Sequence, residues 1–138
     1  MRLPVFVVGT DGNLTQMHPS EPPSEAELQS LIEEHPALIS SEDGKLLLVR
    51  REQPIGDSSD FSARWSVDHL FVTRSAVPVL VEVKRASDTR IRREVIGQML
   101  DYAANSVAFW PSGGVLAAFG AQRGHDEVAV FRDLQEFL

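Results

Sequence analysis

The fold is decided by residues 65–84, with the sequence WSVDHLFVTRSAVPVLVEVK. Two strand-like segments, 65–73 and 77–84, flank a connection at 74–76 that is short enough for an antiparallel hairpin. Within the second segment, residues 78–81 are apolar on both faces, a pattern typical of a strand that is covered on both sides. We therefore expect residues 77–84 to be a central strand of a sheet.

The residues before this hairpin predict an N-terminal extension. Residues 3–8 and 14–17 are expected to form a second hairpin around an Asp-Gly turn at 11–12. Residues 19–24 contain three prolines, which neither a helix nor a central strand would accept. The extension is therefore expected to join the rest of the chain through a stiff connector.

A helix is predicted to begin after Ser24, because Ser24 and Glu27 match a capping box. Apolar residues follow at helical spacing until Pro36, which is expected to end the helix. A strand is then expected at 45–53, followed by a loop at 54–61.

The C-terminal third begins with a predicted helix at 89–105, which has a broad apolar face. Residues 115–119 could be a short helix or a strand. We expect a strand at 127–131 and one or two helical turns at 132–138.

The length of 138 residues suits one compact domain. The order of elements predicts an α/β or α+β fold in which helices pack on a mixed sheet. In this interpretation residues 1–20 are a hairpin extension, 24–105 form the core, and 106–138 complete the sheet.

Composition excludes several classes of function. The chain has no cysteine, which excludes disulfides, cysteine nucleophiles and thiolate metal sites. Its apolar runs are too short to span a membrane, and we expect a cytoplasmic protein. The net charge of −7 argues against a protein that grips nucleic acid along its whole surface.

Three charged residues are expected to converge where the apolar strand ends. Glu82 and Lys84 are two residues apart, so on a strand they project to the same face. Asp68 lies on the neighbouring strand. Two carboxylates and a lysine at a sheet end suit Mg²⁺, which lowers the pKa of bound water, while the lysine can hold that water. The alternative is a surface ion pair without function.

Gln98 interrupts the apolar stripe of the predicted helix at 89–105, and Tyr102 follows one turn later. A buried amide needs partners, so the pair could hold the lysine or a substrate phosphate. The alternative is a satisfied pair in the core.

Asp68, the tripeptide Glu82-Val83-Lys84 and the pair Gln98 and Tyr102 together resemble the PD-(D/E)XK phosphodiesterase superfamily, in its branch with a Q-x-x-x-Y helix. The predicted order of elements is similar to the αβββαβ core of that superfamily. The likeness runs from about residue 24 to residue 102. The sequence departs from the family name at residue 67, where valine replaces proline.

The resemblance implies a restriction-endonuclease-like fold and a Mg²⁺-dependent deoxyribonuclease, with Mn²⁺ as a second usable ion. In the family the acids that match Asp68 and Glu82 ligate the metal, as does the carbonyl at the position of Val83. Lys84 would assist the attacking water. The family often adds a glutamate from the first helix, for which we favour Glu27 and keep Glu25 as the alternative.

Residues 84–93 hold five basic residues and one acid, so they carry +4 and the rest of the chain carries −11. We expect this segment to contact the phosphate backbone beside the site. The net charge then predicts that a small basic surface, next to an acidic metal site, contacts the nucleic acid. The expected phosphate-binding residues are Arg64, Arg85, Arg90, Arg92 and Arg93.

The expected partner is DNA, which could be single-stranded, branched or mismatched, and the protein could act as a homodimer. A degenerate member that binds nucleic acid or a protein without cleavage is the alternative, and an unrelated α/β binding domain is a third. The four histidines lack metal-ligand spacing, and the aromatic residues are too dispersed to predict a stacking platform.

Overall fold

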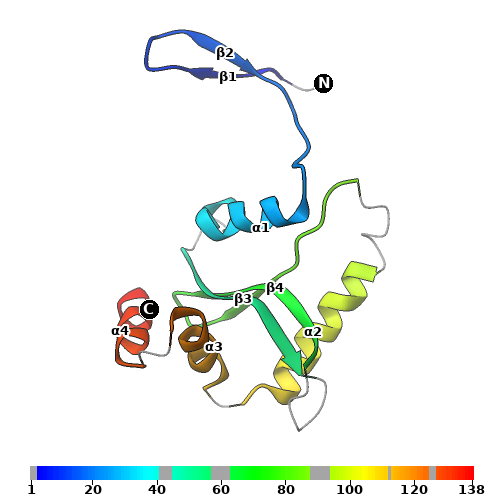
Figure 1. Ribbon diagram of the computed structural model, residues 1–138, viewed down its shortest axis with the longest axis vertical. Helices are drawn as coiled ribbons and strands as arrows, with labels where there is room; N and C mark the ends of the chain where they lie inside the picture. The colour runs from blue at the N-terminus through cyan, green and yellow to red at the C-terminus, as the bar shows by residue number, and fades with distance from the viewer. Residues whose placement is uncertain (1–2, 41–44, 57–62, 88–93, 112, 125–126) are drawn as a thin grey trace.

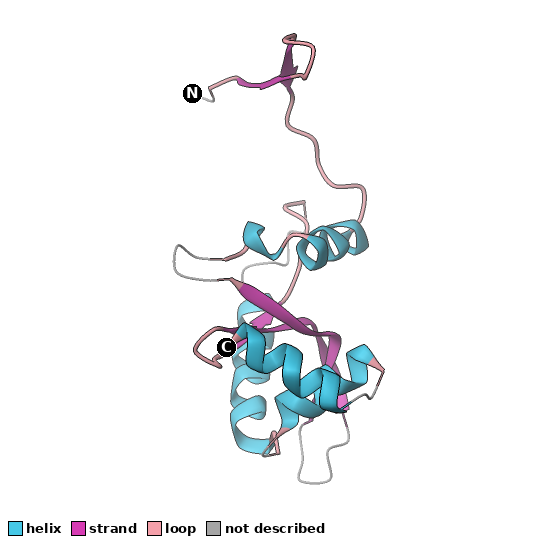
Figure 2. Cartoon of the chain, turned by 90° about the vertical axis from the view of Figure 1, so that its left-hand side faces the viewer, coloured by secondary structure: helices cyan, strands magenta, loops and turns pink. Residues whose placement is uncertain are grey.

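The computed structural model of the chain describes residues 3–40, 45–56, 63–87, 94–111, 113–124 and 127–138. It is a mixed α/β structure in which two small antiparallel sheets are combined with helices (Figures 1 and 2). In chain order the elements are β1 (Val5–Val8), β2 (Leu14–Met17), α1 (Glu25–Glu34), the 3₁₀ turn η1 (Pro36–Leu38), β3 (Leu46–Gly56), β4 (Ala63–Thr73), β5 (Pro78–Val81), α2 (Ile96–Phe109), α3 (Gly114–Arg123) and α4 (Glu127–Phe137).

The main sheet has the order β3-β4-β5, and both pairings are antiparallel. The predicted hairpin is confirmed: its turn is closed by a 3.0 Å hydrogen bond from the Thr73 N–H to the Val77 carbonyl. Two expectations about the sheet are wrong. β4, rather than the segment at 77–84, is the central strand, and the described sheet is antiparallel rather than mixed. The reason is that both connections are hairpins, and no described strand follows β5 to add a parallel neighbour.

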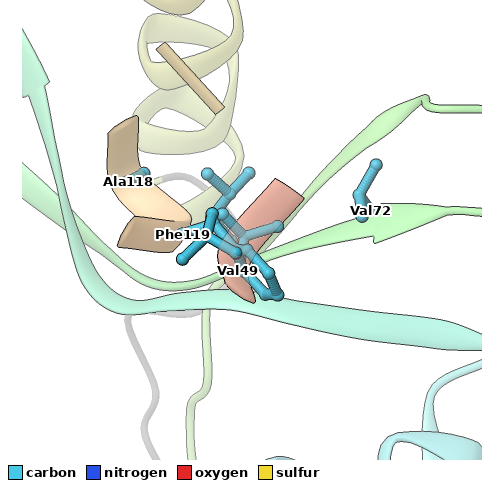
Figure 3. Close-up of a cluster of buried hydrophobic side chains, with 6 residues drawn as sticks. Val49, Val72, Ala118 and Phe119 are labelled. Atoms are coloured by element: carbon cyan, nitrogen blue, oxygen red, sulfur yellow. The ribbon is translucent and has the colours of Figure 1, made fainter. Parts of the chain in front are cut away.

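The helices lie on both sides of the main sheet (Figure 1). On one side α3 and α4 enclose the larger apolar cluster, of which Figure 3 shows Val49 on β3 and Phe119 on α3. A smaller cluster joins Ile55 and Val67 to Tyr102 on α2. Each fully buried large side chain contributes about 1.5–3 kcal/mol relative to leaving it in water, so these clusters hold the helices against the sheet.

The expected strand at 127–131 is wrong, because these residues form the first half of α4. Their β-branched composition favoured a strand, but helical spacing places Val130, Leu134 and Phe137 on one stripe, and all three pack into the larger cluster. Residues 115–119 belong to α3. Residues 106–138 therefore cover the sheet with helices where we expected them to complete it.

The predicted start of α1 is confirmed. The Ser24 hydroxyl accepts a 3.2 Å hydrogen bond from the Glu27 N–H, and the helix ends at Glu34, before Pro36. Other boundaries differ from expectation: β3 continues to Gly56, and β5 ends at Val81.

The N-terminal hairpin of β1 and β2 is also confirmed, with Gly12 in the left-handed conformation its turn requires. All residues of both strands are exposed, and the hairpin stands apart from the rest of the chain beyond an extended connector (Figures 1 and 2). None of the helices in the described ranges is long and apolar enough to cross a membrane.

Candidate functional site

The candidate site lies where β4, the end of β5, α1 and α2 meet. Antiparallel pairing aligns His69 with Val81, and the next step of that register brings Asp68 level with Glu82. The backbone confirms this approach, because the Val83 N–H donates a 2.7 Å hydrogen bond to Oδ2 of Asp68. The two acids that the sequence singled out are thus held at one end of the sheet.

The side chain of Glu82 is almost fully buried, with 5% of its surface exposed. Its Oε1 atom lies 3.0 Å from Nζ of Lys84 and accepts a 3.1 Å hydrogen bond from Nε2 of Gln98. Its Oε2 atom is buried and has no hydrogen-bond partner within the described part of the chain. A buried carboxylate oxygen without a partner is costly.

Lys84 lies between carboxylates. Burial lowers its pKa, but the hydrogen bond and charge of Glu82, with the charges of Glu25 and Asp68, outweigh burial and hold that pKa above its usual value. Lys84 is therefore a permanent cation at neutral pH. As an ammonium ion it can hold an oxygen lone pair or stabilise negative charge.

Gln98 and Tyr102 connect the site to α2 and to β4. Nε2 of Gln98 contacts both Glu82 and the Tyr102 hydroxyl, and that hydroxyl donates a 3.2 Å hydrogen bond to the Ser66 carbonyl. Burial raises the pKa of Tyr102, as do the charges of Glu82 and Asp68. Tyr102 is accordingly a neutral donor that anchors the helix, and the amide orients Glu82.

The glutamate that α1 brings to this site is Glu25 rather than the favoured Glu27. Oε2 of Glu25 lies 3.7 Å from Nζ of Lys84. Glu27 is exposed, and among the described contacts it takes part only through its backbone N–H at the helix cap. Two residues along a helix correspond to a rotation of about 200°, so both side chains cannot face the sheet.

A polar cleft of about 620 Å³ opens beside the site; its lining includes Glu25, Lys84, Arg85, Glu94 and Gln98. Glu94 was not anticipated; it lies two residues before the start of α2 and lines the cleft together with Gln98. A larger cleft of about 730 Å³ between α3 and α4 has no titratable residue among the described residues of its lining, so we place the chemistry in the polar one.

Of the predicted phosphate-binding arginines, Arg85 is exposed and lines the polar cleft. Arg90, Arg92, Arg93 and the side chain of Arg64 lie outside the described part of the structure. Lys84 and Arg85 are therefore the basic residues of the segment 84–93 that line the cleft in the described structure.

The site offers two carboxylates, those of Asp68 and Glu82, to a cation such as Mg²⁺. In the described ranges no three His, Cys, Asp or Glu side chains gather as a metal cage. Mg²⁺ does not need one, because it binds through one or two carboxylates and completes its shell with water and phosphate oxygens. Asp68 and Glu82 supply two carboxylates, and the free Oε2 of Glu82 faces no competing partner in the described part of the site.

No family model matches the chain, and comparisons with curated proteins and with solved structures returned no match.

Proposed function

We propose that the protein is a Mg²⁺-dependent phosphodiesterase that hydrolyses DNA and is built on a restriction-endonuclease-like core. The observation that carries the proposal is Glu82, whose carboxylate is almost fully buried yet leaves one oxygen without a partner in the described structure. In a purely structural ion pair this oxygen would carry a desolvation cost, which a bound cation would offset. Asp68, Lys84 and an open polar cleft stand beside it.

Asp68 and Glu82 would hold the ion, together with the Val83 carbonyl that the family resemblance implies. When bound, Mg²⁺ lowers the pKa of a coordinated water and neutralises charge on the phosphate. Mn²⁺ offers the same oxygen-ligand chemistry and would replace it.

The side chains of the chain have distinct roles around that ion. Lys84 would orient the attacking water and stabilise the charge that develops on phosphorus-bound oxygens. Gln98 fixes the rotamer of Glu82, and Tyr102 ties α2 to the Ser66 carbonyl. Arg85 at the rim of the cleft would contact a backbone phosphate.

A catalytically degenerate module that binds nucleic acid or a protein is the second candidate. It is favoured by the closed network in which Oε1 of Glu82 is satisfied by both Lys84 and Gln98. Such a network stabilises a fold without any metal. The two candidates differ in what happens at the second carboxylate oxygen, Oε2.

Incubation of the protein with labelled single-stranded, duplex and branched DNA tests the proposal. We expect cleavage in Mg²⁺ or Mn²⁺ and none in EDTA. Asp68→Asn and Lys84→Ala should each lower the rate at least 100-fold, in line with the loss of a preorganised electrostatic group. Lys45→Ala is the matched control, because Lys45 is exposed and is the other lysine of the chain.

A second readout is independent of cleavage. Mg²⁺ should raise the melting temperature of the wild type and not of Glu82→Gln, because a ligand stabilises the state that binds it. Binding of DNA without cleavage of any substrate, with no response to Mg²⁺, would favour the degenerate module. If the protein cleaved RNA and none of the DNA substrates, RNA would be its substrate class.

A further inference from the structure

We propose that a second cleft, next to the polar cleft that is lined by Lys84 and hereafter called the catalytic cleft, receives a single unpaired nucleobase of the substrate strand, which stacks on Trp65. This inference rests on the proposed nuclease function and adds the class of substrate: DNA with at least one unpaired base next to the bond that is cut.

The second cleft has a volume of about 390 Å³ and is lined by Trp65, Glu94, Gly97, Gln98, Asp101 and Tyr102. Glu94 and Gln98 also line the catalytic cleft, so the two hollows adjoin along one side of α2. The volume falls within the range of small-ligand sites. A strand whose phosphate lies near Lys84 would therefore have a neighbouring hollow for one of its bases.

Trp65 supplies an aromatic surface at the wall of this cleft. The residue is 41% exposed, although it lies on β4 next to the fully buried Val67. It belongs to neither apolar cluster of the described structure. An indole that belongs to neither described cluster and lines a hollow is suited to stacking, and stacking on an aromatic ring is the usual way in which proteins hold single-stranded bases.

The charges of the two clefts divide the strand between them. The catalytic cleft is lined by two cations, Lys84 and Arg85, beside the carboxylates of Glu25 and Glu94, and these cations can attract phosphate, whereas the described lining of the second cleft holds no cation. Glu94 and Asp101 put carboxylates into the second cleft, where they repel phosphate and accept hydrogen bonds from the amino groups of bases. A base is thus favoured in the second cleft and a backbone phosphate in the first.

A base can enter such a cleft only when it has left the helical stack. Unstacking a paired base costs free energy, and the cost is least for a mismatched or single-stranded base. Duplex DNA without defects should therefore bind only through its phosphates. The geometry gives a preference for single-stranded ends, flaps or mismatches without a reading of base sequence.

Gly97 offers a way to close the cleft without touching the core. A side chain at Gly97 would meet no atom within 4 Å at its Cβ, so the position opens into free space. Gly97→Leu should fill the hollow while leaving the helix intact, because leucine has the higher helix propensity.

The test is affinity for a short single-stranded oligonucleotide and for the matching blunt duplex, measured by fluorescence anisotropy in EDTA so that nothing is cleaved. We expect Trp65→Ala to weaken single-strand binding about 5- to 150-fold and to leave duplex binding unchanged. Trp65→Phe should restore most of the affinity, because the ring is kept. Gly97→Leu should reproduce the loss.

Phe131→Ala is the matched control, since Phe131 is an exposed aromatic residue on α4, away from the cleft. Equal single-strand affinity in Trp65→Ala and wild type, or an equal loss for single strand and duplex, would overturn the base site. Cleavage that needs Asp68 and Lys84 but ignores Trp65 would remove the base site alone. Binding that depends on Trp65 without cleavage would remove the nuclease and keep the base site.

Discussion

Oε1 of Glu82 lies 3.0 Å from Nζ of Lys84, with the glutamate 5% and the lysine 24% exposed at their side chains. The pair joins the end of β5 to α2, because the same oxygen accepts from Gln98. Removing one partner of a buried pair is more damaging than removing both, since it leaves an uncompensated charge. The effect of a substitution on the stability of the site can therefore be measured separately from its effect on catalysis.

Lys84→Ala should lower the free energy of unfolding by about 1–3 kcal/mol, because the buried carboxylate of Glu82 loses its cation. Adding Glu82→Gln to that variant should recover part of the loss, since a neutral amide needs no counter-charge. Urea denaturation of the two single variants, the double variant and the wild type measures the coupling. A double variant less stable than Lys84→Ala would contradict this account, and Lys45→Ala should stay within about 0.5 kcal/mol of wild type.

Glu25→Gln should lower the pKa of Lys84, because one of the carboxylates that raise this pKa becomes neutral. Glu27→Gln on the same helix should leave the pKa unchanged, because Glu27 lies on the exposed side of α1. The pKa can be followed by NMR of the lysine ammonium, and the chain has only two lysines to assign. An equal shift in both variants would mean that the effect is long-range and not a contact of Glu25.

The site was predictable from sequence where the signals are local to a strand or a helix. The strand before Glu82 is apolar and ends in charge, and the spacing of four from Gln98 to Tyr102 places both on one helix line. The choice between Glu25 and Glu27 was not predictable. It depends on how α1 is rotated against the sheet, which is set by contacts with residues distant in the sequence.

The same limit explains the errors in the fold. Residues 127–131 include two β-branched side chains, Val128 and Val130, which favour a strand, and the packing of Val130 in the cluster of Phe119 makes the helix preferable. The apolar run at 78–81 indicated a central strand, yet β5 has four residues and pairs with β4 alone in the described sheet. Short apolar runs carry too little information to place a strand within a sheet.

Phe119→Ala should destabilise the protein by about 3–5 kcal/mol, because Phe119 is fully buried in the larger cluster and its loss leaves a cavity. Phe6→Ala should change the free energy of unfolding by less than about 0.5 kcal/mol, since Phe6 is 50% exposed on a hairpin that stands apart. Thermal unfolding of both variants makes the comparison. A large loss in Phe6→Ala would show that the hairpin packs on the rest of the protein.

His69 should make the protein less stable in mild acid. The residue is fully buried on β4, and burial lowers its pKa; Arg51 lowers it further, while Asp68, Glu33 and the Gln29 carbonyl oppose this without reversing it. Below the unfolded-state pKa of about 6.5, the unfolded chain binds a proton that the folded chain does not. The free energy of unfolding should therefore fall as the pH drops from 7 to 5, by at most about 1.4 kcal/mol per pH unit for this group.

His69→Phe keeps a ring beside Phe71 and should flatten that dependence, whereas His35→Phe, at an exposed position, should not. Urea titrations at several pH values measure the slopes, and an equally steep slope in His69→Phe would assign the acid sensitivity to the carboxylates instead.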